Sequence, residues 1–399
     1  MKINNSHLTY CTNIHPGEEW SQVFANLQEY VLPLKAQLAP HQPFGIGLRL
    51  AAVAARELLQ GDALSEFKLW LNEHDLYVFT LNGFPYGEFH RQVVKDQVYA
   101  PDWSTSSRLD YTLQLVTILT ALLPDGMEGS ISTSPLSYKP WFKGSTPIDV
   151  FERASLHLAQ VVVKMVHIRA QTGKLIHLDL EPEPDGLIEN AAEVVDYFQR
   201  YLLPIAGAYL VKTLGISSED AAACLREHIR VCYDTCHFAV AYEDPLTVFK
   251  QFQAAGIQIG KIQISAALQV DLPVGGDRYL LQERLQPFAE STYLHQVIAR
   301  DSTDTLCHYS DLQLALPELQ ESVATQWRIH FHVPLFIRDY QLFQSTQDDI
   351  VTVLDLLGDG SYHLEIETYT WEVLPPEMKL DLPASIQREY EWVMGKIYA

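Results

Sequence analysis

The chain has 399 residues, of which 47% are hydrophobic, so it contains enough apolar material for a sizeable buried core. Its 28 basic and 50 acidic residues give a formal net charge of −22, which disfavours a nucleic-acid partner because such binding depends on Lys and Arg side chains that neutralise phosphates. The N-terminus lacks an apolar signal core, and the longest apolar stretch, residues 113–123, is broken by Gln114 and Thr117. These features predict a globular cytoplasmic protein without stable membrane insertion.

Short β-rich segments alternate with longer helical segments along the whole chain. The helical stretch 109–123 follows N-cap residues at 104–107 and stops at Pro124, and the stretch 187–203 ends at Pro204. This alternation predicts a parallel sheet with crossover helices. The predicted strands are residues 7–13, 44–50, 76–82, 129–134, 175–181, 229–234, 260–265, 327–333 and 362–367.

The two faces of these strands differ in polarity. One face of residues 175–181 is apolar, whereas the other carries His177, Asp179 and Glu181, and residues 362–367 alternate in the same way. An open sheet covered by helices on both sides would be apolar on both faces. The pattern therefore predicts an α/β protein with a closed (β/α)8 TIM barrel, residues 1–399 forming a single domain with a polar interior.

Nine predicted strands are one more than an eight-stranded barrel needs. Residues 268–326 separate the strand at 260–265 from the strand at 327–333 by an unusually long interval, with a Gly-rich stretch at 273–277. We interpret residues 268–326 as an insertion and a possible lid over the C-terminal face of the barrel.

The five cysteines are an odd number in a long chain and do not resemble a disulfide framework. Cys232 and Cys236 also lack the spacing of a C-x-x-C redox or zinc pair. We therefore expect reduced, buried thiols.

Ionisable side chains gather at the ends of the predicted strands, where the functional face of such a barrel lies. Glu181, Asp234, His332 and Glu367 lie at or just past strand ends, and His237 follows Asp234 by three residues. Mixed carboxylate and imidazole ligands suit one divalent ion, such as manganese, magnesium, cobalt or zinc. The sequence thus predicts a metal centre at this end of the barrel.

The residues Glu181, Asp234-x-x-His237 and Glu367 resemble those of the xylose isomerase-like TIM-barrel superfamily of sugar isomerases, ketose 3-epimerases and endonuclease IV-type nucleases. The resemblance implies that Glu181, Asp234 and Glu367 are metal ligands. The family places a histidine ligand at the end of the seventh strand, where this chain has Gln263. Either Gln263 replaces that ligand, or residues 327–333 form the seventh strand and His332 is the ligand; we favour His332.

Five stretches spread over nearly the whole chain carry a second resemblance. They are Leu8-Thr-Tyr-Cys-Thr-Asn-Ile-His15-Pro-Gly, Asn82-Gly-Phe-Pro-Tyr86-Gly, Leu180-Glu181-Pro-Glu-Pro-Asp-Gly, Tyr233-Asp234-Thr-Cys-His237 and Glu365-Ile-Glu367-Thr-Tyr-Thr-Trp371. Together they are similar to the metabolite-traffic TIM-barrel proteins of the bacterial ebo gene cluster (EboE-like). That resemblance implies a role in moving or processing a metabolite and specifies no reaction.

The predicted centre suits proton transfer at carbon. A metal that bridges a hydroxyl and a carbonyl oxygen acidifies the shared carbon and stabilises the enediolate, while Glu181 and Glu367 remove and return the proton. We therefore predict a divalent-metal-dependent isomerase or epimerase that acts on a small polyol or related small-molecule metabolite. The alternative is a carrier-type protein that keeps the barrel and metal site without turnover. A nuclease would need a basic surface, which the charge of −22 disfavours.

Several residues near the strand ends are further candidates for substrate binding. They are His237, His15, Asn82, Tyr86, Arg49, Gln263 and Trp371. For Arg49 the alternative is an internal ion pair with Asp179 or Glu365. For Trp371 the alternative is packing under the insertion, and Glu183 is interpreted as a charge on the rim.

Overall fold

The computed structural model describes residues 1–144, 147–273, 278–358, 360–375 and 381–398, so most of the Gly-rich stretch at 273–277 lies outside the described residues. Eight parallel strands form the predicted TIM barrel. In ring order they are β2 (Ser6–Tyr10), β15 (His363–Ile366), β8 (Ile259–Ile264), β7 (Ile229–Asp234), β6 (Ile176–Leu180), β5 (Gly129–Thr133), β4 (Leu76–Asn82) and β3 (Phe44–Arg49). A bridge between Cys11 and Gly47 joins the ends of the ring, and β1 (Lys2–Ile3) pairs antiparallel with β2.

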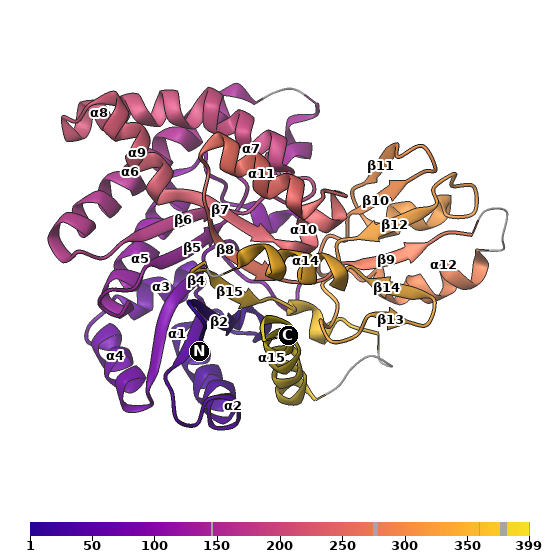
Figure 1. The fold of residues 1–399 in the computed structure, drawn as a ribbon, viewed down its shortest axis with the longest axis horizontal. Helices are drawn as coiled ribbons and strands as arrows, with labels where there is room; N and C mark the ends of the chain where they lie inside the picture. The colour runs from indigo at the N-terminus through magenta and orange to yellow at the C-terminus, as the bar shows by residue number, and fades with distance from the viewer. Residues whose placement is uncertain (145–146, 274–277, 359, 376–380, 399) are drawn as a thin grey trace.

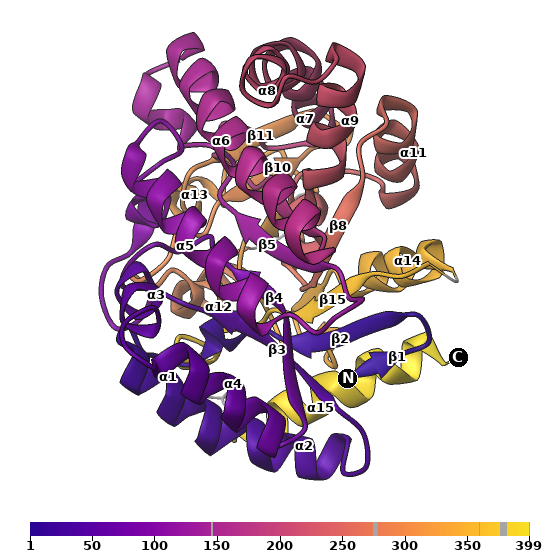
Figure 2. The ribbon, with the colours of Figure 1, turned by 90° about the vertical axis from the view of Figure 1, so that its left-hand side faces the viewer.

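Helices surround the barrel (Figures 1 and 2), because the outward face of each strand is apolar and must be covered. The predicted helix 109–123 is confirmed as α5, and its N-cap residue Thr105 accepts a hydrogen bond from Arg108 N. The helices are α1 (Trp20–Asn26), α2 (Leu32–Leu38), α3 (Ala52–Leu58), α4 (Ala63–Glu73), α5 (Ser106–Leu122), α6 (Ile148–Thr172), α7 (Ala191–Tyr197), α8 (Gly207–Leu214), α9 (Ser218–His228), α10 (Thr235–Val240), α11 (Pro245–Ala255), α14 (Gln347–Leu357) and α15 (Leu382–Ile397).

The prediction that a helix ends at Pro204 is wrong. A π-helical stretch, Phe198–Ala206, continues α7 and leads into α8, which ends at Gly215 in a left-handed conformation with φ 69°. Proline has no backbone N–H and its ring crowds the preceding turn of an α-helix. The wider π-helical turn accommodates Pro204 without ending the helix.

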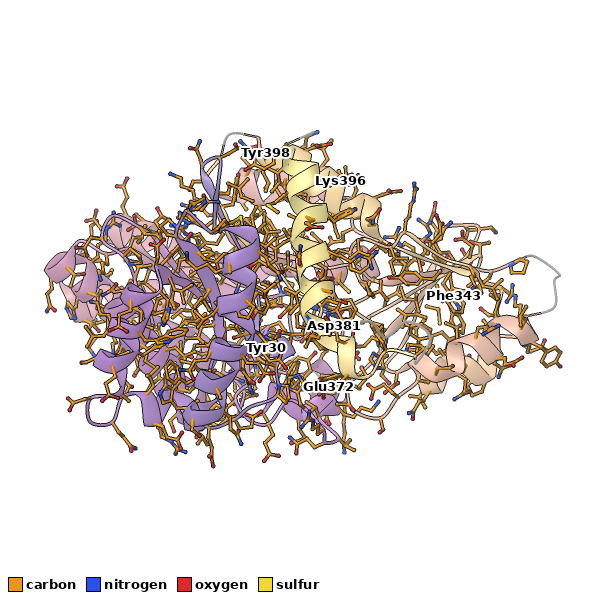
Figure 3. The ribbon with its side chains drawn as sticks, turned by 90° about the horizontal axis from the view of Figure 1, so that it is seen from below. Tyr30, Phe343, Glu372, Asp381, Lys396 and Tyr398 are labelled. Carbon is orange, nitrogen blue, oxygen red and sulfur yellow. The ribbon has the colours of Figure 1, made fainter. Side chains whose placement is uncertain are left out.

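The last helix, α15, packs on the outside of the barrel. Figure 3 shows it running from Asp381 to Tyr398 beside the N-terminal helices, and it contacts α2. Its residue Tyr390 is buried and lies against Tyr10 and Phe44, at ring-centroid distances of 6.3 and 5.7 Å. This helix therefore covers the barrel wall at β2 and β3.

A second sheet stands beside the barrel (Figure 1) and connects β8 to α14. All of its strand pairs are antiparallel, and three of its strands extend beyond residue 326. Two short helices, α12 (Tyr279–Leu285) and α13 (Leu312–Ala315), accompany it. In sheet order the strands are β11 (Leu306–Tyr309), β10 (Val297–Arg300), β12 (Gln326–Ile329), β9 (Leu268–Asp271), β14 (Phe343–Ser345) and β13 (Asp339–Tyr340).

The alternative in which residues 327–333 form the seventh barrel strand is wrong. The strand between β7 and β15 in the ring is β8, and β12 pairs antiparallel with β9 and β10 in the second sheet. A barrel strand of this fold must be parallel to its neighbours, whereas β12 is joined to β10 and β9 in the opposite direction. Trp327 and Ile329 of β12 are fully buried.

Two further expectations concern membrane insertion and cysteine. In the described ranges, no helix has the length and apolarity that crossing a membrane requires. All five cysteines lie in those ranges and are free. Cys11, Cys232 and Cys236 are buried as predicted, whereas Cys224 is half-buried and Cys307 is exposed on β11. The expectation of buried thiols thus fails at the last two positions.

The interior of the barrel is polar, as the strand faces predict. Lys261 and Glu365 form an ion pair of 2.6 Å with side chains 0% and 1% exposed, and His177 Nδ1 lies 2.7 Å from Asp179 Oδ1. Gly47 provides the space for the Glu365 carboxylate, because a Cβ atom at position 47 would overlap Glu365 Oε1 and lie 2.7 Å from the Tyr10 carbonyl oxygen.

Replacement of Gly47 by alanine is accordingly expected to destabilise the protein by about 1–3 kcal/mol, the usual cost of overpacking a close-packed interior. Urea unfolding monitored by circular dichroism would measure the change. Gly87→Ala is the matched control, because a Cβ atom there meets no described atom within 4 Å. Equal unfolding midpoints for the two variants would contradict this packing role.

Candidate metal and substrate site

Seven ionisable side chains converge at the C-terminal end of the barrel. They are Glu181 and Glu183 after β6, Asp234 at the end of β7, His237 in α10, His330 and His332 after β12, and Glu367 after β15. Each is at most 6% exposed. Together with Cys236, these side chains offer ligand atoms in four overlapping groups of three, and the atoms of each group lie within 4.8 Å of one another. The groups are Glu181–Asp234–Glu367, Asp234–His237–His332, Glu183–His237–His330, and Cys236–His330–His332.

The three imidazole rings are oriented by their Nδ1 atoms. His332 Nδ1 lies 2.6 Å from the Glu367 carbonyl oxygen, and His237 Nδ1 lies 3.1 Å from the Pro182 carbonyl oxygen. His330 Nδ1 lies 2.8 Å from Gln296 Oε1. Because these partners accept hydrogen bonds, Nδ1 carries the proton and Nε2 keeps its lone pair. The Nε2 atoms of His330 and His332 have no hydrogen-bond partner among the described residues.

The carboxylates are also oriented. Asp234 Oδ1 accepts hydrogen bonds from the backbone N–H groups of Cys236 (2.8 Å) and His237 (3.1 Å) and from Ser265 Oγ (2.6 Å). Within the part of the chain that the structure describes, Asp234 Oδ2 and Glu181 Oε2 are buried without a partner. Asp234 thus uses one oxygen to cap α10 and leaves the other for a ligand.

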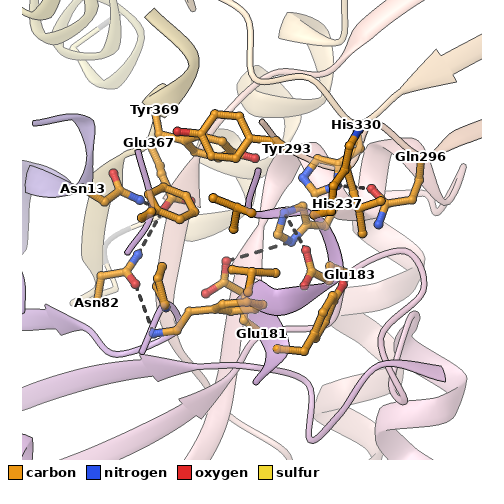
Figure 4. Close-up of a pocket in the computed structure, with 18 residues that line it drawn as sticks. Asn13, Asn82, Glu181, Glu183, His237, Tyr293, Gln296, His330, Glu367 and Tyr369 are labelled. Carbon is orange, nitrogen blue, oxygen red and sulfur yellow. Dashed lines mark hydrogen bonds and ion pairs between the residues drawn. The ribbon is translucent and has the colours of Figure 1, made fainter. Parts of the chain in front are cut away.

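Two amides hold Glu367. Its Oε1 atom accepts hydrogen bonds from Asn13 Nδ2 (2.7 Å) and from Asn82 Nδ2 (2.9 Å), which Figure 4 shows on one side of the pocket. Asn82, a predicted substrate-binding residue, contacts this carboxylate and also lines the adjoining pocket. The two amides thus fix the direction of the Glu367 carboxylate.

The electrostatics of the cluster favour a cation. Burial and the neighbouring carboxylates Glu367 and Asp234 raise the pKa of Glu181 well above its usual range, and burial, Asp234 and Glu365 do the same to the pKa of Glu367. Burial opposes ionisation of Asp234 too, but His237, His332 and the Ser265 hydroxyl lower its pKa. Burial lowers the pKa of His237 to about 4. Crowded carboxylates beside neutral imidazoles, with ligand atoms left unpaired, fit a divalent metal ion.

The second sheet positions His332 at the C-terminal end of the barrel. After β12 the chain returns to the barrel mouth, where Val333 N donates to the Ala266 carbonyl oxygen and Thr370 Oγ1 donates to the His332 carbonyl oxygen. His332 therefore reaches the cluster although β12 is not a barrel strand. Gln263 lies on β8 in register with Asp234, and neither polar atom of its side chain has a partner in the described ranges.

A mainly apolar pocket of about 60 Å³ adjoins the cluster (Figure 4). The wall comes from barrel loops and from the second sheet region. Its apolar and aromatic members include Phe84, Phe89, Val94, Val98, Tyr99, Tyr293, Leu294 and Tyr369.

Five of the predicted substrate-binding residues do not line this pocket, namely His15, Arg49, Tyr86, Gln263 and Trp371. His15 and Trp371 line a separate cavity with Tyr30, and the His15 ring stacks on Tyr30 at 4.1 Å. Tyr86 packs against Arg108 and Tyr111. The sequence reveals that His15 and Tyr86 lie in turns. It does not reveal towards which cavity each side chain points.

Arg49 is buried and contacts other residues of the protein. It pairs with Glu18 at 3.1 Å and donates to the Gly17 and Gly87 carbonyl oxygens. The predicted pairing with Asp179 or Glu365 is wrong, because His177 and Lys261 occupy those carboxylates.

Sequence reasoning missed two members of the cluster. Glu183 was interpreted as a rim charge but is buried, with Oε1 unpaired among the described residues. His330 lies 4.6 Å from His237 between ring centroids. The signals that could have found them are the two-residue spacings Glu181-x-Glu183 and His330-x-His332, which repeat an ionisable group on one side of an extended chain.

Comparisons with known proteins support the fold. No protein-family model matches the chain, and no curated protein matches it in sequence. A xylose isomerase-like TIM barrel protein from Mycobacterium smegmatis in complex with magnesium aligns with 100% of this chain and 98% of its own, at 10% identity and TM-score 0.52. A D-tagatose 3-epimerase-like protein (9% identity, 98% and 97% covered, TM-score 0.48) and the IOLI protein with a binding zinc atom (12%, 98% and 98%, 0.47) also align. At these identities the likeness to the first shows a shared fold.

Proposed function

We propose that this xylose isomerase-like TIM barrel is a divalent-metal-dependent isomerase or epimerase that moves a proton on a carbon flanked by a hydroxyl and a carbonyl group. Glu181, Asp234, His332 and Glu367 would hold the ion. The observation that carries the proposal is the convergence of buried carboxylate and imidazole atoms, several without a partner among the described residues, beside a pocket. The substrate class is a small hydroxy-carbonyl metabolite such as a ketose.

A bound ion supplies Lewis-acid polarisation of the substrate's oxygens. The residues of the chain do the rest. Glu181 and Glu367 come from strands separated by β7 and β8 in the ring, so they approach a substrate from different sides. One takes the proton and the other returns one, which inverts the carbon; a single carboxylate serving both steps moves the proton to the adjacent carbon.

The residues around Glu181 and Glu367 support these two roles. Asn13 and Asn82 hold Glu367 in place, and His237, with Nε2 3.8 Å from Asp234 Oδ2, is positioned to orient a substrate oxygen. The apolar wall lowers the polarity beside the charged cluster, and this strengthens the electrostatic interactions inside the pocket.

A carrier without turnover is the second candidate. Gln263 on the seventh barrel strand, β8, where the resemblance implies a histidine ligand, favours it. The stretches similar to the ebo-cluster proteins imply a role in moving or processing a metabolite and specify no reaction. Both candidates require the metal site, so they differ in whether proton exchange occurs.

Proton exchange with solvent distinguishes the two. Metal-loaded protein incubated in D2O with hydroxy-ketones and ketoses is expected to place deuterium on the carbon beside the carbonyl, as read by mass spectrometry and NMR. Glu181→Gln and Glu367→Gln should each lower the rate at least about 100-fold, the usual contribution of a positioned acid or base. Glu243→Gln, at a partly buried carboxylate that accepts a hydrogen bond from Ala191 N, is the control expected to retain the rate. Metal-loaded wild type that exchanges no proton in any of these compounds would favour the carrier.

A further inference from the structure

The pocket beside the metal ligands presents hydrogen-bond acceptors that the proposed ion does not use. The four residues assigned to that ion leave Glu183 and His330, and both of these line the pocket. We propose that these two side chains bind a protonated amino group, so that the substrate is an amino-substituted hydroxy-carbonyl compound. The inference rests on the proposed function, because it names the class of substrate for the same site.

The orientation of His330 makes its free nitrogen an acceptor. Gln296 Nε2 donates to the Pro184 carbonyl oxygen at 3.0 Å, so the other end of this amide, Oε1, faces His330 Nδ1 at 2.8 Å. Because Oε1 only accepts hydrogen bonds, Nδ1 carries the proton and Nε2 keeps its lone pair. His330 Nε2 has no partner among the described residues, and the residue is only 5% exposed. A ligand that binds this nitrogen must therefore be a donor.

Glu183 supplies a second acceptor nearby. Its Oε1 atom is also buried without a partner in the described ranges, and Figure 4 shows Glu183 and His330 on the same side of the pocket. Possible ligand atoms of the two residues lie within 4.8 Å of each other. Two acceptors that each stand about 2.8 Å from one ammonium nitrogen are about 4.6 Å apart, since its N–H bonds point to the corners of a tetrahedron. An ammonium group has three donors and a hydroxyl has one, so the amine satisfies both acceptors.

Aromatic rings surround the same pocket. Its wall includes Phe84, Phe89, Tyr99, Tyr293 and Tyr369. The rings of Phe89, Tyr293 and Tyr369 form one cluster, with centroid distances of 5.1, 5.3 and 5.0 Å. The face of an aromatic ring carries the negative part of its quadrupole and attracts a cation, most strongly away from water. The wall therefore favours an ammonium group over an anion.

The charges around the pocket also disfavour an anionic substrate. Lys95 is the only lysine or arginine among the described residues that line it, and its Nζ atom lies 2.6 Å from Asp311 Oδ2. The same Nζ atom donates to the Glu290 carbonyl oxygen. The net charge of −22 attracts cations to the protein and repels anions. A phosphate group in this pocket would thus meet a lysine that is already paired.

The amino position lies close to the metal position. His237 stands between the two, with Nδ1 3.9 Å from Glu181 Oε1 and Nε2 3.9 Å from Glu183 Oε2. The two carboxylates are therefore about one imidazole ring apart. A short carbon chain between the hydroxy-carbonyl unit and the amine spans this interval.

Binding of matched hydroxamates tests the inference, because a hydroxamate chelates a metal through two oxygen atoms, as a hydroxy-carbonyl unit does. Three compounds of similar length differ at the far end: 3-aminopropanohydroxamate carries an ammonium group, butanohydroxamate a methyl group and succinic monohydroxamate a carboxylate. Each would be titrated by calorimetry into tag-free protein dialysed against zinc. We expect the amine to bind at least about 10-fold more tightly than butanohydroxamate, the usual effect of a hydrogen bond to a charged group, and the carboxylate to bind most weakly.

Two variants assign the preference to its residues. Glu183→Gln and His330→Leu should each reduce the preference for the amine to less than about 3-fold, because each removes one of its partners. Their affinity for butanohydroxamate should stay that of the wild type, which shows that the metal position is intact. His295→Asn is the matched control: it replaces a fully buried histidine of the same region whose ring nitrogens contact Glu290 and the His330 carbonyl oxygen, and it should keep the preference.

Equal or tighter binding of butanohydroxamate or of the carboxylate by the wild type would overturn the amino group and leave the metal position intact. A preference that persists in both variants, or that is also lost in His295→Asn, would overturn the assignment to Glu183 and His330. If none of the three hydroxamates bound to the zinc-dialysed protein, the metal centre of the proposed function would fail together with this inference.

Discussion

The Asp234→Asn variant is expected to fold normally and to bind divalent metal more than about 100-fold more weakly than the wild type, since even outer contacts of a metal site contribute about 10–100-fold. Asp234 Oδ1 caps α10, and asparagine caps helices as well as aspartate does. Asp234 Oδ2 has no partner in the described part of the chain, and the substitution replaces it with an NH2 group that cannot ligate.

Thermal unfolding with and without metal measures both effects. At a metal concentration of 100 Kd the wild type gains about 2.7 kcal/mol, and a 100-fold weaker variant gains about 0.4 kcal/mol. Without metal the variant should be no more stable than the wild type, because His237, His332 and the Ser265 hydroxyl favour the ionised form of Asp234 in the folded protein. Equal metal-induced gains in stability in the two proteins would contradict the assignment of Asp234 as a metal ligand.

Substitution of Lys261 by methionine is expected to cost about 3–5 kcal/mol of stability, because it leaves the carboxylate of a buried ion pair without its cation. Lys261 Nζ and Glu365 Oε2 are 2.6 Å apart in the barrel interior, where both side chains are almost inaccessible. The interaction with Glu365 outweighs the effect of burial and raises the pKa of Lys261, so the amine is charged in the folded state.

Denaturant unfolding of metal-free protein would measure this loss. The double variant Lys261→Met/Glu365→Leu should recover most of it, because replacing a whole buried pair with apolar groups is often neutral. Arg153→Met breaks a pair with Asp149 in which both side chains are more than 60% exposed, and it should cost less than about 1 kcal/mol. A double variant as unstable as Lys261→Met would show that the pair itself is not the cause.

The barrel could be predicted from the sequence because its strands alternate between an apolar outer and a polar inner face. That pattern is local, and it places Glu181, Asp234 and Glu367 at strand ends without knowledge of the neighbouring strands. The direction of a strand relative to its neighbours is not encoded in the local sequence. The alternation of Trp327 and Ile329 suits a barrel strand as well as the antiparallel β12, so the ring order needed the structure.

The site was predictable to the same extent. His332 reaches the cluster as expected, but from the second sheet and not from a seventh barrel strand. Its position depends on the return of the chain after β12, and the burial of Glu183 depends on the packing of the same region, neither of which is encoded in local spacing. Arg49 shows the same limit. It pairs with Glu18, whereas Asp179 and Glu365 pair with His177 and Lys261, and local sequence does not reveal these partners.

Anomalous diffraction from crystals grown with zinc tests the metal centre most directly. The expected result is a peak within about 2.3 Å of the carboxylate oxygens of Glu181, Asp234 and Glu367 and of His332 Nε2. An anomalous map without a peak at the C-terminal end of the barrel, at saturating zinc and neutral pH, would contradict the assignment of these residues as metal ligands.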